Sequence, residues 1–224
     1  MIRHLATAAA ATLACSAVAT ADTVDLVGGQ TSVLLDTAAL EDLASLSLSG
    51  VTGDVIVPGN LGPDSVAFGI NPRNGNLPTT FSYDPDDFLN TFSGSIEHSG
   101  SVLFNDDTVE VGDFTIGFDA NRAGGFGGAA SGFFVESTAG IAAILFDIEN
   151  PTNLVATETE LTIEADLLVS AEFGQFLFDN GLSDTNLAGA DVGDALVQGV
   201  AVPGPAGLAV LAGAGLLGRR RRRA

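Results

Sequence analysis

The sequence contains no lysine and no tryptophan, and only one cysteine and one tyrosine among its 224 residues. Without lysine, neither a P-loop nor a Ser/Lys catalytic pair can form. The single cysteine, Cys15, lies close to the N-terminus, so the region after it offers neither disulfides nor thiolate ligands. That region also has one histidine, His98, and transition-metal enzymes usually need two or more.

Positive charge is scarce and unevenly placed. The chain has 8 basic and 28 acidic residues, for a net charge of −20. Six arginines lie near the ends, so that only Arg73 and Arg122 balance the 28 acids between them, which leaves −26 on the central region. Phosphates would repel such a region, so we expect no nucleic-acid partner. Because 46% of the residues are hydrophobic, the chain can bury a core and is not a disordered polyanion.

The N-terminus has the pattern of a secretory signal. A short basic stretch, Met1 to His4, precedes an Ala- and Leu-rich run from Leu5 to Val18. Ala19 and Ala21 are the small residues that a signal peptidase inspects, so we predict cleavage before Asp22. The alternative is an Ala-rich helix buried in the domain.

The C-terminus has three parts. A proline motif comes first, then an apolar segment, and then Arg219, Arg220, Arg221, Arg222 and Arg223. The apolar segment from Ala206 to Gly218 would measure about 20 Å as a helix, which is short against a hydrocarbon layer of about 30 Å. The arginines favour the cytoplasmic side, which leaves the acidic region outside.

This ending resembles the sorting signals of PEP-CTERM proteins, in particular the variant with the motif Val-Pro-Leu-Pro-Ala. The matching residues are Val202, Pro203, Pro205 and Ala206, and Gly204 replaces the leucine. The resemblance covers about the last two dozen residues and implies recognition by an exosortase-like membrane enzyme. It further implies transient anchoring in the inner membrane of a Gram-negative bacterium, followed by location at the cell surface or outside, with exopolysaccharide as a partner. The alternative is a tail anchor that is never cleaved.

The residue pattern of the central region predicts β-strands. Leu161, Ile163, Ala165 and Leu167 alternate with polar residues, as in a half-buried antiparallel strand. Similar apolar runs, separated by Gly, Asn, Asp and Pro, occupy residues 31–35, 51–57, 65–70, 79–83, 101–104, 108–118, 132–135, 141–148, 159–169 and 191–200. They predict an all-β fold, an antiparallel β-sandwich or jelly roll.

Helices are expected at four places. Thr37 can cap a short helix over 38–44, and Ser170 can cap another over 171–177 with Glu172 in its first turn. The signal and the C-terminal apolar segment would each add a helix. We therefore divide the chain into a signal peptide (1–21), an acidic β ectodomain (22–199) and a sorting segment (200–224).

Two acidic loops are candidate calcium sites. The carboxylates are Asp84, Asp86 and Asp87 in one loop and Asp106 and Asp107 in the other. Calcium prefers oxygen ligands, but neither loop has the spacing of an EF-hand. Solvated turn residues are the favoured interpretation for both loops, and Ca²⁺ is the one cofactor that the sequence suggests.

Three other features invite functional hypotheses. The glycine-rich stretch 124–130 leads into an apparent strand, so it predicts a loop and not a dinucleotide site. Arg122 is expected to pair with Asp119 or with another carboxylate. His98 is expected in a turn or at the surface, and a Ser/His/acid arrangement around it stays open.

The leading functional hypothesis is an exported, non-enzymatic surface or matrix protein. One alternative is a calcium- or glycan-binding module. The other is a polysaccharide hydrolase, which needs two carboxylates in one cleft. The chain lacks tryptophan platforms for sugars, and its 14 phenylalanines are expected in the core.

Overall fold

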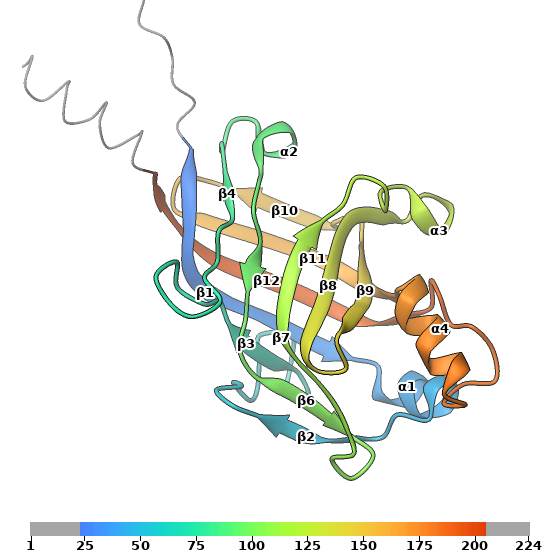
Figure 1. Ribbon diagram of the computed structural model, residues 1–224. Helices are drawn as coiled ribbons and strands as arrows, with labels where there is room; N and C mark the ends of the chain where they lie inside the picture. Colours follow the sequence, from blue (N-terminus) through green and yellow to red (C-terminus); the bar gives the residue numbers. More distant parts are fainter. Residues whose placement is uncertain (1–22, 205–224) are drawn as a thin grey trace, which may run out of the picture.

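The computed structural model describes residues 23–204, which form one curled antiparallel sheet with short helices at its margins (Figure 1). The described strands are β1 (Val24–Leu35), β2 (Leu48–Thr52), β3 (Val66–Gly69), β4 (Ser82–Tyr83), β5 (Ile96–Glu97), β6 (Ser101–Phe104), β7 (Val109–Phe118), β8 (Ala130–Gly140), β9 (Ala143–Glu149), β10 (Asn153–Ala156), β11 (Glu160–Val169) and β12 (Asp191–Pro203). The described helices are α1 (Thr37–Ala44), α2 (Phe88–Thr91), α3 (Gly125–Gly128) and α4 (Ala171–Asp179).

The predicted all-β, antiparallel fold is confirmed. The strand order is β2-β6-β7-β8-β9-β11-β12-β1-β3, and all the strand pairings are antiparallel. Three short strands pair at the sides: β4 with β1, β5 with β7 and β10 with β11. The sheet curls, so that the strands at its β2-β6-β7 end face those at its β12-β1-β3 end, as the layers of a sandwich do (Figure 1). We call these two groups of strands the arms of the sheet, and both belong to one continuous sheet.

The core lies inside the curl. Leu26 of β1, Ile116 of β7 and Leu161 of β11 belong to one buried cluster, although two strands separate β7 from β11 in the sheet order and four separate it from β1. A backbone bridge between Ile70 and His98 also links the segment after β3 to the segment after β5. Burial of apolar surface from both arms therefore stabilises the curl.

The first and last strands pair along nearly their whole length. Their register runs from Val24 opposite Pro203 to Leu35 opposite Gly193, with a shift at Leu26/Gly28. At Gly29 the backbone of Gln198 comes so close that a Cβ atom would collide with it, and the φ of +121° also favours glycine. Because Val24 is opposite Pro203, the described chain begins and ends side by side at the same end of the domain.

The predicted short helices are confirmed, with one correction. Helix α1 begins at Thr37, and its N-cap is Asp36, whose Oδ1 accepts a hydrogen bond from the Ala39 N–H at 2.9 Å. The prediction that Thr37 is the cap was therefore wrong by one residue. Helix α4 is capped by Ser170 as predicted, with Glu172 in its first turn.

The structure adds elements that the sequence pattern did not predict, including β5, β10 and α2. It also extends β12 to Pro203, so residues 200–203 of the predicted sorting segment belong to the sheet. Within residues 23–204, no helix is long and apolar enough to cross a membrane. The predicted signal helix and C-terminal helix lie outside the described residues, as do Ala19, Ala21, Asp22, Pro205, Ala206 and Arg219 to Arg223.

Candidate functional site

His98 lies in the core, where it joins the two arms of the sheet. Its Nε2 accepts a hydrogen bond from the Thr31 hydroxyl of β1 at 2.8 Å, and its Nδ1–H donates to the Phe114 carbonyl of β7 at 3.1 Å. The residue is only 2% exposed, so the expected turn or surface position was wrong. Among the described residues, neither ring nitrogen contacts a serine or a carboxylate, and no Ser/His/acid triad forms around it.

Burial lowers the pKa of His98 from 6.5 to about 4, because the charged ring would lose its hydration inside the domain. The hydrogen bond to the Phe114 carbonyl and the charge of Glu97 oppose this shift only in part. At neutral pH the ring is uncharged, with one nitrogen donating and the other accepting. His98 is therefore a structural tie between β1 and β7.

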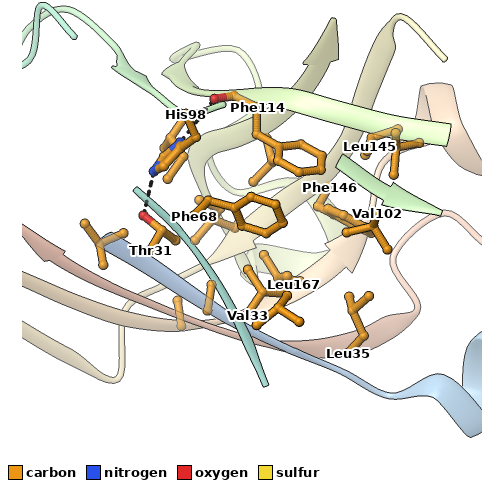
Figure 2. Close-up of a pocket in the computed structure, with 18 of the residues that line it drawn as sticks. Thr31, Val33, Leu35, Phe68, His98, Val102, Phe114, Leu145, Phe146 and Leu167 are labelled. Atoms are coloured by element: carbon orange, nitrogen blue, oxygen red, sulfur yellow. Dashed lines mark hydrogen bonds between the residues drawn. The ribbon is translucent and has the colours of Figure 1, made fainter. Parts of the chain in front are cut away.

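A small apolar cavity of about 80 Å³ lies beside this tie. Figure 2 shows the His98 ring on one side and the rings of Phe68 and Phe114 facing the cavity, with Leu145 and Leu167 beyond them. The Phe68 and Phe114 rings meet edge to face at 4.9 Å. Both nitrogens of His98 are already paired, so the cavity offers no polar group to a ligand.

Arg122 is held by two carboxylates. Its Nε and Nη2 donate to the two oxygens of Asp147 at 2.6 and 2.9 Å, and its Nη1 and Nη2 donate to the oxygens of Glu172 at 2.7 and 2.9 Å. The guanidinium also lies 5.7 Å from the centre of the Phe134 ring. The predicted pairing with a carboxylate is confirmed, but Asp119 is not the partner, since its Oδ1 accepts from Asn121.

This ion cluster joins α4 to β9. Hydrogen bonding to Glu172 and then to Asp147 raises the pKa of Arg122, and the same bond to Arg122 lowers the pKa of Glu172. The Asp147 side chain is only 4% exposed and would be an unpaired buried charge without the arginine. Arg122 therefore neutralises an internal charge and is not available to recognise a substrate carboxylate.

The first acidic loop is organised by its own hydrogen bonds. Asp84 Oδ1 accepts from the Asp86 N–H at 3.0 Å, and Asp87 Oδ1 accepts from Asn90 Nδ2 at 2.7 Å. Asp86 and Asp87 are exposed, and the loop leads from β4 into α2. These contacts are those of a polar turn.

The second acidic loop is the hairpin turn between β6 and β7. Asp106 and Asp107 both have left-handed backbone angles and are exposed. Figure 1 shows this hairpin and α2 at opposite ends of the sheet, so the five aspartates do not surround one point. Among the described residues, no group of three or more His, Cys, Asp or Glu side chains could hold a metal ion. Calcium binding by either loop stays a prediction.

Asp107 also lines a cleft of about 500 Å³ together with Glu110, between the β6–β7 hairpin and the end of α4. Glu110 Oε1 accepts a hydrogen bond from the Ser101 hydroxyl at 2.6 Å. Two carboxylates in one cleft are what a glycosidase would need, so the hydrolase alternative stays a prediction too.

An acidic pair that the sequence analysis did not single out lies on β11 and β12. Asp166 and Asp194 are directly opposite each other in the register. Burial, and then the charges of Asp166 and Asp191, raise the pKa of Asp194. Like charges facing each other across strands oppose folding, and within residues 23–204 no arginine pairs with them.

The glycine-rich stretch behaves as predicted. Residues 125–128 form the single turn α3, which leads directly into β8. The Gly124 N–H donates to the Ala130 carbonyl, and Asn150 Nδ2 donates to the carbonyls of Gly128 and Ala129. The stretch is a turn before a strand and does not open a βαβ unit.

The largest of these openings is a cleft of about 620 Å³ beside α2, which we call the aromatic cleft. Its apolar walls are Phe88, Leu89, Phe92, Phe118, Phe133, Leu154 and Ile163, with Asn90, Ser131, Asn150 and Pro151 at its margins. Its volume is within the range of small-molecule and peptide pockets.

The floor of the cleft consists of three phenyl rings that contact one another. Phe92 meets Phe118 at 4.8 Å and Phe133 at 4.9 Å, and Phe118 meets Phe133 at 5.1 Å. Leu89 is 72% exposed at the margin, and Phe118 is 41% exposed. The expectation that the phenylalanines fill the core was therefore wrong for Phe118, whereas Phe92 and Phe133 are partly buried and pack against the core. Together the three rings form a surface that an apolar ligand could cover.

Comparison with known proteins gives little beyond the fold. No protein-family model matches the chain, and no curated protein is significantly similar to it. Among solved structures, the C-terminal domain of HtaA from Corynebacterium glutamicum is similar, with a TM-score of 0.44 and 14% sequence identity. The similarity covers 80% of this chain and 99% of that domain, and it identifies neither a family nor a function.

Replacing Arg122 with methionine should destabilise the domain by about 3 to 5 kcal/mol, because Asp147 would be buried without a partner. Arg73→Met is the matched control, since the Arg73–Asp25 pair, at 3.3 Å, is more exposed. That control should lose only about 1 kcal/mol. Urea unfolding of the two variants measures both losses, and equal losses would contradict the role given to Arg122.

The neutral state of His98 predicts a pH dependence of stability. Between about pH 6.5 and pH 4 the unfolded chain takes up a proton at His98 that the folded domain excludes. In that window this group should lower the free energy of unfolding by up to about 1.4 kcal/mol per pH unit as the pH falls, with no effect above it. Comparing the urea midpoints of the wild type and His98→Gln across pH isolates the effect. NMR titration of the ring gives an independent check, and a midpoint near pH 6.5 would refute burial of a neutral ring.

Proposed function

We propose that the protein is an exported, non-enzymatic surface or extracellular-matrix protein whose last residues form an exosortase-type sorting signal. The observation that carries this proposal is the pairing of β1 with β12, which brings Val24 opposite Pro203. Thr23, next to the predicted signal peptidase site, and Gly204, within the predicted sorting motif, therefore lie side by side at one end of the domain. Cleavage before Asp22 and after Pro203 would leave the buried core residues, which run from Val24 to Ala201, in the mature domain.

The hydrogen bonds at this end support the same division. The Gly204 N–H donates to the Thr23 carbonyl at 2.8 Å, just beyond the Val24–Pro203 pair. Pairing of β12 with β11 ends at Val200, so Val202 and Pro203 are held from one side only, by β1. A processing enzyme would meet a motif that emerges from the sheet at its margin.

The charge distribution fits an extracellular location. The acidic domain would stay outside while the arginines mark the cytoplasmic side of the membrane. The strong negative charge keeps copies of the domain apart and soluble. An anionic surface of this kind would bind exopolysaccharide through neutral sugar groups or through bridging divalent cations.

Replacing both Pro203 and Pro205 with alanine should block processing and leave the protein in the membrane fraction. Processing is measured as the mass of the mature chain, and location by fractionation of cells that carry the matching exosortase. Pro63→Ala, in an exposed loop outside the aromatic cleft, is the control and should be processed normally. Normal processing and location of the double variant would contradict the sorting assignment.

A further inference from the structure

The aromatic cleft is an apolar surface that the described domain leaves partly uncovered. Three phenyl rings form its floor, and Leu89 and Leu154 stand exposed at its margins. An extracellular domain gains stability and solubility when such a surface is covered. The polar groups at the margin are already engaged, since Asn90 donates to Asp87 and Asn150 donates to two backbone carbonyls. An apolar occupant therefore fits the cleft better than a polar one.

The surroundings of the cleft are acidic. Asp87 contacts the marginal Asn90, Asp119 follows Phe118, and Glu149 precedes Asn150. Within residues 23–204 only two cations could balance these charges, and both Arg73 and Arg122 are already paired with carboxylates. The cleft therefore favours an occupant with an apolar body and a basic end.

The end of the described chain lies close to the cleft. Pro203 is opposite Val24, Val24 is also paired with Tyr83, and the Tyr83 ring lies 5.3 Å from the ring of Phe88 in the cleft wall. Figure 1 shows the end of β12, β4 and α2 at the same end of the molecule. Thirteen residues reach about 20 Å as a helix and about 45 Å when extended. A segment that continues from Gly204 can therefore reach the cleft.

We propose that the aromatic cleft is the docking site of the chain's own apolar segment, residues 206–218, with the arginines at 219–223 against the acidic margin. The inference goes beyond the sorting function and does not require the segment to be cleaved. Docking would shield the apolar segment in water and would compete with its insertion into a membrane. Removal of the segment would then uncover the cleft for another apolar ligand.

Disulfide trapping tests the proposal directly, because the chain becomes free of cysteine once Cys15 is replaced with alanine. In that full-length background, Leu89→Cys with Leu211→Cys places one thiol at the cleft and one in the segment. Val200→Cys with Leu211→Cys is the control, since Val200 is 52% exposed, lies outside the cleft and is nearer to residue 211 along the chain.

When the segment is undocked, the thiol at position 211 reacts faster with the thiol at position 200, because fewer residues link the two and effective concentration falls with the length of the linker. When the segment is docked in the cleft, the reaction with the thiol at position 89 becomes the faster one. We expect the Leu89 pair to form the intramolecular disulfide several times faster than the Val200 pair under mild oxidation without detergent. A faster Val200 pair would overturn the proposal. Disulfides formed mainly between chains would also overturn it, in favour of an occupant from a second copy.

A cleft variant supplies a second control. Phe118→Asp places a charge on the cleft floor and should abolish the advantage of the Leu89 pair. Phe178→Asp changes a phenylalanine of similar exposure, 47%, on α4 outside the cleft, and should leave the advantage intact. Equal effects of the two aspartates would contradict docking in the cleft. Failure of the sorting experiment would not change any of these rates, so the two proposals fail separately.

Discussion

The pairing of β1 with β12 is the constraint on which the rest of the domain depends. It joins residues at opposite ends of the described chain, from Val24 with Pro203 to Leu35 with Gly193. Strand β12 also pairs with β11, and β1 with the short strand β3, so neither is an edge strand, although β1 is next to last in the strand order. This contact of high sequence separation brings both ends of the described chain to the same end of the domain.

Two sets of polar contacts, at His98 and at Arg122, stabilise the curled sheet. His98 links β1 to β7 through an uncharged ring, and Arg122 links β9 to α4 by pairing with the buried Asp147 and the half-exposed Glu172. A domain with so few cations and no disulfide uses one of its two arginines in the interior. Neither described arginine compensates the surface charges of Asp166 and Asp194, which face each other across β11 and β12, so salt should weaken their repulsion.

Much of the fold could be predicted from local pattern, because a half-buried strand has a period of two. Leu161, Ala165 and Leu167 of β11 are buried as their alternation predicts. Strand β10 could not be predicted, since Leu154 and Val155 are both exposed and show no alternation. The burial of His98 depends on Thr31, 67 residues away, and Arg122 meets Glu172 across 50 residues. Likewise, the sequence does not distinguish the phenylalanines of the aromatic cleft from those of the core, because both sets lie beside similar apolar runs.

The most direct test of this account is native-state hydrogen exchange of the β1 and β12 amides. If their pairing closes the domain, these amides should exchange only through global unfolding, with the same free energy of opening as the central strands β8 and β9. Exchange of β1 and β12 through a local opening of much lower free energy would show that the terminal strands fray independently. The core would then be complete without them, and the central claim would be wrong.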